Sequence, residues 1–201
     1  MFKVVCFPDY GCGGILCASL NYDNVPILSN GEIPSEYHEA LKFCSSISSF
    51  DESEWNAAKS RCIKWGYDKF WLGTHSHPSH IINDPQVEII LYVNVASMES
   101  RCLLAARQCK SESHYKIECM KLCLTSRYKD NMLWTNLLND PKVIQLDFYH
   151  LINNPSYRNT RLKQHGITFD ANLWDEWYRY NDFRNDADLI MQEYAKLNMH
   201  V

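Results

Sequence analysis

Three closely spaced glycines near the start of the chain set the strongest constraint on how it folds. Residues 3–7 form a short apolar, β-branched run that predicts a buried strand. Residues 8–14 break this run, and residues 15–20 have the composition of the first turns of a helix. A helix that begins directly after such a turn directs unpaired N–H groups, and roughly half a positive charge from its dipole, towards one point. The segment therefore predicts a cradle for an anionic group, formed by Pro8, Asp9, Tyr10, Gly11, Cys12, Gly13, Gly14 and Ile15.

The glycines themselves admit two interpretations. At positions 11, 13 and 14 they let the backbone approach a ligand closely, or they serve a tight turn that is needed for packing only. The spacing is neither GxxxxGK[ST] nor GxGxxG after a clean strand, so the ordinary nucleotide-binding motifs do not fit.

Strand-like and helix-like segments alternate along the rest of the chain. Strands are predicted at residues 68–74, 87–93 and 143–146, and helices at 51–65, 97–128, 154–165 and about 172–198, with a further helix start at residue 34. This alternation predicts a single α/β domain over residues 1–201, with three layers in which helices cover both faces of a mostly parallel sheet. Ligands of such sheets bind at the carboxyl ends of the strands. We therefore expect the functional edge at residues 8–14, 74–80 and 94–101.

Composition argues against several function classes. The net charge of −4 provides no general basic field for nucleic acid or an acidic membrane surface, so we expect neither partner. The sequence has no run of 18 apolar residues, and we expect no secretory leader. The nine cysteines include no CxxC pair and are expected to be reduced thiols in the cytoplasm. Cys12 is the thiol worth testing, because a helix N-terminus lowers the pKa of a thiol.

Several segments, taken in order, resemble the sulfotransferases, a P-loop-like family that uses 3′-phosphoadenosine-5′-phosphosulfate as donor. The pattern Phe-Pro-x-x-Gly-x-Gly-Gly at residues 7–14 resembles the phosphosulfate-binding loop of the family. Residues 69–75 resemble its strand that ends in Thr-His, residues 89–94 its strand that leads to the 3′-phosphate site, and residues 146–155 its late strand and turn. The resemblance implies a sulfotransferase-type fold. It also implies transfer of a sulfo group to a hydroxyl of a small or glycan-like acceptor, without a metal ion; the oligomeric state stays open.

The resemblance assigns roles to individual residues. The amides of residues 11–14 would hold the 5′-phosphosulfate, and Asn94, Ser97 and Arg101 would lie around the 3′-phosphate.

A base must also take the proton of the acceptor hydroxyl. An imidazole suits this role because its unperturbed pKa is about 6.5. His75, at the end of a predicted strand, is the first candidate, and His38 and His77 follow.

The chain departs from the family pattern at three positions. Asp9 stands where the family usually carries a lysine, Asn94 replaces the arginine at the strand end, and Cys102 replaces a serine. These departures leave a second interpretation open, in which the chain is a non-catalytic descendant that binds another anion or a protein partner.

The histidines after the strand at residues 68–74 suggest a third interpretation. Leu-Gly-x-His-Ser-His-Pro at residues 72–78 also resembles the zinc isopeptidases of the JAB/MPN family, which implies a zinc hydrolase. His75 and His77 alternate, so they can share one side of a strand and bind one metal ion. The nominal acidic partners are Glu32, Glu36 and Glu39. A solvated, hydrogen-bonded histidine cluster without metal is the alternative.

Basic residues gather between positions 101 and 129, namely Arg101, Arg107, Lys110, Lys116, Lys121 and Arg127. They can hold a phosphorylated ligand by charge-assisted contacts. A solvated helix face explains them equally well.

Overall fold

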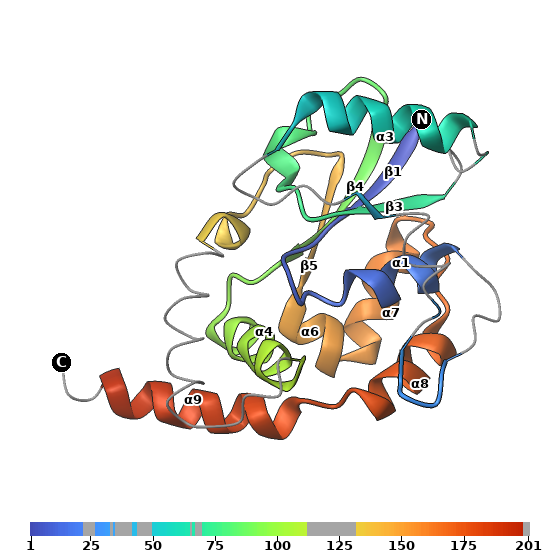
Figure 1. Ribbon diagram of the computed structural model, residues 1–201. Coiled ribbons are helices and arrows are strands. Elements are labelled where there is room, and N and C mark those ends of the chain that lie inside the picture. Colours follow the sequence, from blue (N-terminus) through green and yellow to red (C-terminus); the bar gives the residue numbers. More distant parts are fainter. Residues whose placement is uncertain are drawn as a thin grey trace.

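The structure is a computed structural model that describes residues 1–21, 27–32, 34, 42–43, 50–64, 66, 70–111 and 132–198 (Figure 1). The strands are β1 (Phe2–Cys6), β2 (Lys42–Phe43), β3 (Trp71–Thr74), β4 (Val87–Asn94) and β5 (Val143–Asp147). The α-helices are α1 (Gly13–Asn21), α3 (Glu52–Lys64), α4 (Met98–Ser111), α6 (Phe148–Asn153), α7 (Pro155–Gln164), α8 (Ala171–Tyr180) and α9 (Arg184–Asn198). Short 3₁₀ helices, η1 (Pro78–His80) and η2 (Met132–Thr135), precede β4 and β5.

The strands in the described part of the chain form one parallel sheet in the order β2-β3-β1-β4-β5. β1 lies in the centre, where Cys6 is opposite both Thr74 of β3 and Tyr92 of β4. Val4 and Val5 are completely buried, as expected for a strand that is covered on both faces. The predicted α/β fold with a parallel sheet is confirmed.

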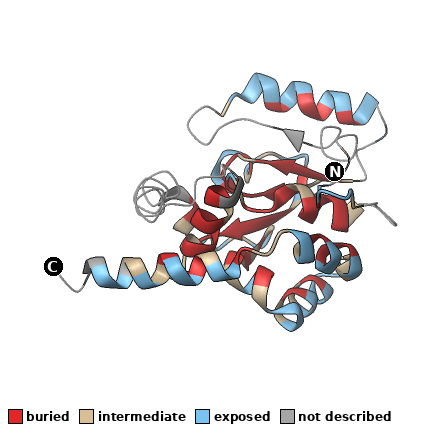
Figure 2. Ribbon diagram, turned by 60° about the horizontal axis from the view of Figure 1, so that its bottom comes forward, coloured by how far each residue is buried: buried red, intermediate tan, exposed pale blue. Residues whose placement is uncertain are grey.

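Helices lie on both sides of this sheet. β1 leads through α1 to β2 in one direction, whereas β2 leads through α3 to β3 in the other, so right-handed crossovers place α1 and α3 on opposite faces. Figure 1 shows α3 along one side of the sheet and α1, α8 and α9 on the other. α1 packs against α8, and α4 packs along α9. Figure 2 shows the strands buried between these helices, whose outer faces are exposed, which is compatible with three layers.

The prediction of one long helix at about 172–198 is wrong, because α8 and α9 are separate helices. The Asn181 side chain donates a hydrogen bond to the Trp177 carbonyl oxygen at 3.0 Å and covers the end of α8. The Asp182 carboxylate accepts from the backbone N–H of Arg184 at 3.0 Å, at the start of α9. Short polar side chains that bond to the local backbone thus end one helix and begin the next.

The other predicted elements agree in place. β3, β4, β5, α3 and α7 overlap the predicted segments, and α6 is an additional short helix. α4 corresponds to the first part of the helix predicted at 97–128, of which residues 112–128 lie outside the described residues, as does most of the helix predicted from residue 34. No helix within the described ranges has both the length and the apolar character needed to cross a bilayer.

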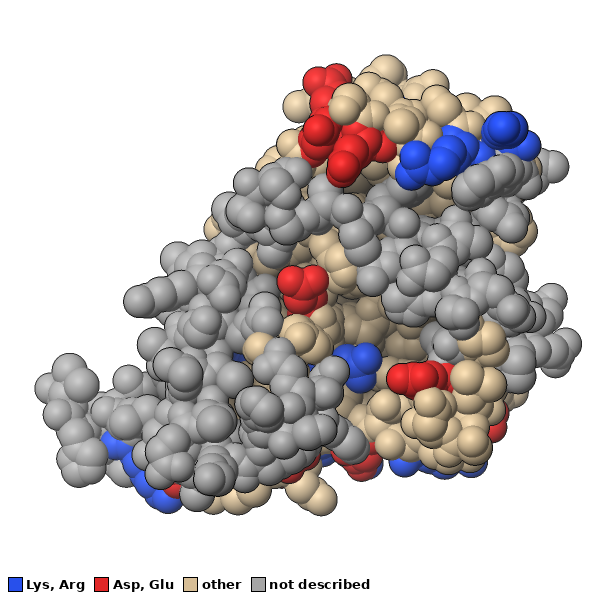
Figure 3. Space-filling view, viewed as in Figure 1, with Lys and Arg blue, Asp and Glu red and all other residues tan. Residues whose placement is uncertain are grey.

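The charges of α3 are arranged to suit its dipole. Glu52 and Glu54 lie in its first turn, and Arg61 and Lys64 lie in its last turn. Figure 3 shows the acidic and basic groups separated along this part of the surface. Acids near a helix N-terminus and bases near its C-terminus stabilise the helix by a few tenths to about 1 kcal/mol each.

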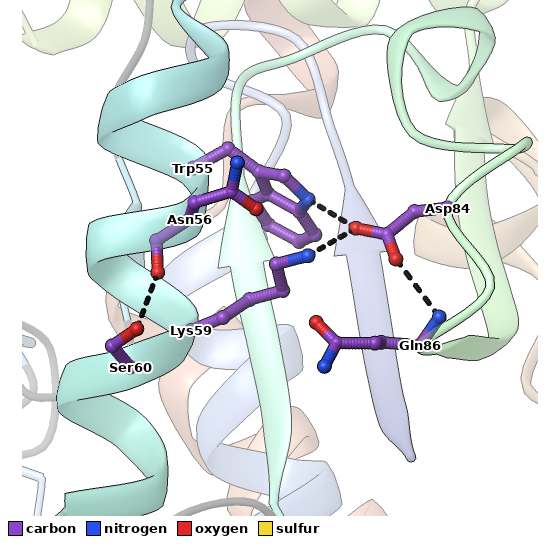
Figure 4. A network of polar contacts seen from close by, with 6 residues as sticks. All are labelled: Trp55, Asn56, Lys59, Ser60, Asp84 and Gln86. Atoms are coloured by element: carbon purple, nitrogen blue, oxygen red, sulfur yellow. Dashed lines mark hydrogen bonds and ion pairs between the residues drawn. The ribbon is translucent and has the colours of Figure 1, made fainter.

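A buried ion pair connects α3 with the loop before β4 (Figure 4). The Lys59 ammonium group, on a residue only 5% exposed, pairs with the Asp84 carboxylate. The same carboxylate accepts hydrogen bonds from Trp55 Nε1 at 2.7 Å and from the backbone N–H of Gln86 at 2.8 Å. Burial raises the pKa of Asp84, but the hydrogen bond and the charge of Lys59, together with the hydrogen bonds from Trp55 and Gln86, outweigh it and hold the pKa below its ordinary value. The carboxylate is therefore the charged partner that Lys59 needs inside the protein.

We expect Asp84→Asn to lower the free energy of unfolding by about 3 kcal/mol at neutral pH, because the Lys59 charge is then buried without its partner. Urea denaturation followed by tryptophan fluorescence measures this loss, with Asp188→Asn on the exposed surface of α9 as the matched control.

The pH dependence separates this ion pair from a general packing effect. Because the folded-state pKa of Asp84 is lowered, its stabilisation is present above the unfolded-state value of about 3.9 and is lost as the pH falls through the folded-state pKa. The stability difference between the wild type and Asp84→Asn should therefore shrink in acid. A difference that stays constant down to pH 2 would contradict the role given to the pair.

Candidate functional site

The strand order places the loops after β1 and β4 beside each other at a switch point of the sheet. The connection after β1 leaves towards β2, whereas the connection after β4 leaves towards β5 on the other side. In parallel α/β sheets, ligands bind in the crevice where such neighbouring connections diverge. Residues 7–12 and residues 95–97 border this place, and the end of β3 at Thr74 adjoins it. The three segments expected at the functional edge thus follow three adjacent strands.

The turn after β1 has a tightly defined backbone. The Gly11 N–H donates to the Pro8 carbonyl oxygen at 2.9 Å. Tyr10 and Cys12 have φ values of 62° and 59°, in the left-handed region that residues with a Cβ seldom adopt. Such strained positions persist only where the surrounding structure holds them in place.

Gly11 and Gly13 are explained by contacts inside the protein. A Cβ at position 11 would lie 2.8 Å from the Pro8 carbonyl oxygen, and a Cβ at position 13 would lie 2.1 Å from the Phe7 ring. Neither glycine has a positive φ. Packing alone explains why Gly11 and Gly13 are glycines. A close approach of the backbone to a ligand is not needed to explain them. Gly14 is only half-buried.

The first turn of α1 still offers hydrogen-bond donors. The first hydrogen bond of the helix runs from the Leu16 N–H to the Cys12 carbonyl oxygen at 3.0 Å. The N–H groups of Gly13, Gly14 and Ile15 precede it and have no acceptor among the residues that the structure describes. The predicted strand, turn and helix are therefore present, and the helix start has the donors and the dipole that suit an anion.

His75, which follows β3, lies against the turn after β1. Its Nδ1 is 3.2 Å from the Phe7 carbonyl oxygen and 3.3 Å from Asp9 Oδ1. Both neighbours are acceptors, so Nδ1 carries a proton, and in the neutral ring Nε2 is the basic nitrogen. The Phe7 ring packs edge-on against the imidazole, with 4.6 Å between the ring centroids. Asp9 thus pairs with the predicted base.

His77 has a different environment from His75. It is 2% exposed, and its Nδ1 accepts from the Ser79 backbone N–H at 3.2 Å, which caps η1. Its ring packs edge-on against Tyr92 and Trp134, with centroid distances of 5.4 and 5.5 Å. These contacts give His77 a structural role at the end of the sheet.

A zinc site at His75 and His77 has little support in the described residues. Both Nδ1 atoms have protein partners, and no group of three His, Cys, Asp or Glu side chains in the described ranges is placed to hold a metal ion. Glu32 is exposed and bonds to Asn30. The other nominal acids, Glu36 and Glu39, lie outside the described residues, as does His38, the second candidate base.

Two of the residues that were expected near the 3′-phosphate form hydrogen bonds with the loop after β4. Asn94 is 4% exposed, and its Oδ1 lies 3.4 Å from the Ala96 N–H that donates to it. Arg101 Nε donates to the Val95 carbonyl oxygen at 3.3 Å, and its Nη2 donates to the Ala96 carbonyl oxygen at 3.2 Å. Both side chains therefore hold the loop in its observed shape.

Ser97, the third of these residues, bonds to a carboxylate that was not among the predicted site residues. Asp147 Oδ2 lies 3.3 Å from the Ser97 hydroxyl and 3.0 Å from the Ser100 hydroxyl. Asp147 Oδ1 accepts from the His150 N–H at 3.1 Å and caps α6. An aspartate between a strand and a helix is a typical N-cap, and this sequence signal points to it. Asp147 places a negative charge close to Ser97.

The expectation that the thiol of Cys12 has a lowered pKa is wrong. The residue is 3% exposed, and burial raises the pKa of its thiol to about 11, although the positive charge of Arg107 acts in the opposite direction. The cost of desolvating a thiolate thus outweighs the helix N-terminus. The other described cysteines are also buried and form no disulfide, namely Cys6, Cys17, Cys62, Cys102 and Cys109.

We expect Cys12 to resist alkylation in the folded protein, because a thiol with a pKa of about 11 is only roughly 0.1% thiolate at pH 8. Brief treatment with iodoacetamide, followed by peptide mass spectrometry, measures the labelling of each cysteine. The urea-unfolded protein is the control, in which Cys12 should react like the other thiols. Preferential labelling of Cys12 in the folded protein would contradict the raised pKa.

Comparisons of this chain with protein-family models, with curated proteins and with solved structures find no match.

Proposed function

We propose that this chain binds 3′-phosphoadenosine-5′-phosphosulfate at the β1–α1 turn and transfers its sulfo group to a hydroxyl of a small or glycan-like acceptor. The observation that carries the proposal is the placement of His75, paired with Asp9, beside a helix start whose first amides have no acceptor in the part of the chain that the structure describes. The proposal includes the P-loop-like sulfotransferase type of fold, which the parallel sheet and the strand–turn–helix start support. It also includes a cytoplasmic location with reduced thiols.

In the proposed reaction, the acceptor oxygen attacks the sulfur of the donor. A new O–S bond forms, the bond from sulfur to the bridging phosphate oxygen breaks, and 3′-phosphoadenosine-5′-phosphate leaves with the bonding electrons. His75 Nε2 takes the proton of the acceptor hydroxyl. Asp9, whose Oδ1 lies 3.3 Å from Nδ1, stabilises the imidazolium ion that results, while the amides of Gly13, Gly14 and Ile15 hold the negatively charged oxygens. No metal ion takes part.

The proposed binding of the 3′-phosphate has weaker support than the proposed binding of the 5′-phosphosulfate. Arg101 would have to exchange its bonds to the Val95 and Ala96 carbonyl oxygens for bonds to the phosphate. Such an exchange is favourable in charge, because a phosphate is a stronger acceptor for a guanidinium group than a carbonyl oxygen. Ser97 would have to bind beside the Asp147 carboxylate, which repels a phosphate.

The second candidate function is a non-catalytic protein that binds a different anion or a protein partner with the same turn. Asp147 favours it, because its charge lies near the place that the resemblance gives to the 3′-phosphate. Such a protein would use the amides of α1 without the sulfo transfer. Binding of an anion in the absence of turnover distinguishes it from the enzyme.

We expect the wild-type protein to bind 3′-phosphoadenosine-5′-phosphate in calorimetry at neutral pH, and Gly14→Glu to bind it at least about tenfold more weakly than Gly14→Gln. The two variants differ only in charge at the helix start, where Gly14 is half-buried and has no positive φ. An acid at this position suits the helix dipole. No binding by the wild type at millimolar ligand would overturn the proposal.

We expect His75→Gln to reduce sulfo transfer by about 100-fold or more, because the base is lost, while binding of 3′-phosphoadenosine-5′-phosphate changes little. Asp9→Asn should give a smaller loss, since the imidazole keeps its bond to the Phe7 carbonyl oxygen. Transfer of labelled sulfate to a panel of hydroxyl acceptors measures both. His77→Gln is unsuitable as a control because His77 is buried, so His165→Gln on the exposed surface serves instead. Full turnover by His75→Gln would exclude His75 as the base.

A further inference from the structure

Helix α3 has an exposed face on the outside of the molecule. Its other side is buried against the sheet and consists of Trp55, Ala58, Lys59 and Cys62. A helix turns by about 100° per residue. The side opposite the buried one, called the outer face of α3 below, is therefore formed by four exposed residues, Ser53, Ala57, Ser60 and Lys64. Figures 1 and 2 show α3 at the edge of the molecule, with its exposed side turned away from the sheet.

The outer face can be covered by another molecule at little cost in hydrogen bonds. The Ser53 hydroxyl donates to Asp51 Oδ1 at 2.7 Å. The Ser60 hydroxyl donates to the Asn56 carbonyl oxygen at 2.9 Å. A partner that covers these hydroxyls therefore leaves neither proton without an acceptor. The short side chains let a second helix approach closely, and Ile63, which is 56% exposed at the edge of the face, adds apolar area to the contact.

Glu54 and Arg61 are exposed on one and the same edge of the outer face. They are seven residues apart, so their directions around the helix differ by only about 20°. Side chains on a helix pair at a spacing of three or four residues, and at this spacing both have only alanines between them, at positions 57 and 58. Within the described residues neither side chain forms an ion pair. The edge thus has an acid near one end and a base near the other, and α3 itself does not pair them.

A two-fold axis matches these charges between two copies of the chain. When two outer faces meet with the helices antiparallel, an axis perpendicular to the helices places each edge of one face opposite the same edge of the other. An axis that passes beside positions 57 and 58 is equally far from Glu54 and Arg61. It therefore brings Glu54 of each copy opposite the partner's Arg61, in two equivalent pairs. In a parallel arrangement the two charged edges would lie on opposite sides of the contact, and the charges would not meet.

We propose that this chain forms a symmetric dimer through the outer face of α3, with the helices antiparallel and Glu54 of each copy paired with the partner's Arg61. The inference is independent of the proposed function. A contact between two helices of 13 residues is at the low end of specific interfaces, so we expect a dissociation constant on the order of 10–100 µM. The acidic and basic groups that Figure 3 shows on this part of the surface are open to solvent, so salt should weaken the dimer.

Sedimentation velocity of the reduced full chain, at concentrations from about 10 µM to about 1 mM, measures the dimer. Glu54→Arg and Arg61→Glu each convert two attractive contacts into two repulsive ones. An equal mixture of the two variants restores both attractions in a heterodimer. The double variant Glu54→Arg/Arg61→Glu restores them in a homodimer. Glu176→Arg, which reverses an exposed charge on α8, is the matched control.

We expect each single variant to dimerise at least about tenfold more weakly than the wild type. The mixture, the double variant and the control should dimerise within about threefold of the wild type. Thermal melting curves give the separate effect of the reversed charges on the helix dipole, which the double variant disturbs most. If the double variant fails to fold, the mixture of the single variants decides.

Three results would overturn the proposed dimer. The first is a wild type that stays monomeric at about 1 mM. The second is a dimer that neither single reversal weakens, because its contact then lies elsewhere on the molecule. The third is a loss of dimer that the mixture does not restore, because the charges of residues 54 and 61 then do not meet across a two-fold axis.

Discussion

The ring of Phe7 is the contact on which the junction between β1 and α1 depends. A Cβ at Gly13 would lie 2.1 Å from this ring, and a Cβ at Gly73 of β3 would lie 3.1 Å from it. The ring also packs edge-on against His75, whose Nδ1 bonds to the Phe7 carbonyl oxygen. Position 13 must therefore lack a side chain for α1 to start this close to the sheet. The turn, the helix start and the imidazole form one packed unit, so the placement of the amides and of His75 follows from the same contact.

The charges around this unit are distributed unevenly. Each of two acids has a polar partner: Asp9 lies within ion-pair distance of His75, and Asp147 accepts from the Ser97 and Ser100 hydroxyls. The amides in the first turn of α1, by contrast, have no acceptor in the described residues. A ligand with one strongly bound anionic group at the β1–α1 turn, and weaker contacts at the ends of β4 and β5, suits this distribution. Electrostatic interactions are stronger at the low dielectric of a protein interior than in water, so this uneven distribution has a larger effect on a ligand than it would have in water.

The sequence predicts the parts of this structure that depend on local pattern. The apolar run before the glycines, the β-branched segment of β4 and the start of α3 after Asp51 are each visible in a few residues, and all are present. The break between α8 and α9 was missed, because the apolar pattern on either side looks continuous and the caps at Asn181 and Asp182 are single residues. Their position inside an otherwise helical pattern shows that local hydrogen bonding can override periodicity.

The candidate site was predictable in its position but not in its partners. Strand ends in a parallel sheet meet at one edge, so the segments that form the site follow from the topology. The pairing of His75 with Asp9, of Ser97 with Asp147, and the stacking of Arg107 on Trp177 join residues from different elements. No spacing in the sequence encodes such contacts. The same applies to His77, which looks equivalent to His75 in the sequence and becomes a buried cap in the fold.

The presence of an acid at position 9, in the β1–α1 turn, has a physical explanation within this arrangement. An acid at position 9 would weaken an anion site if it faced the ligand alone, because like charges repel in a partly buried turn. Here the carboxylate lies against the imidazole Nδ1–H, so much of its charge is directed to His75 and away from the helix start. The pairing of Asp9 with His75 therefore allows an acid to precede the α1 amides that have no acceptor within the described residues.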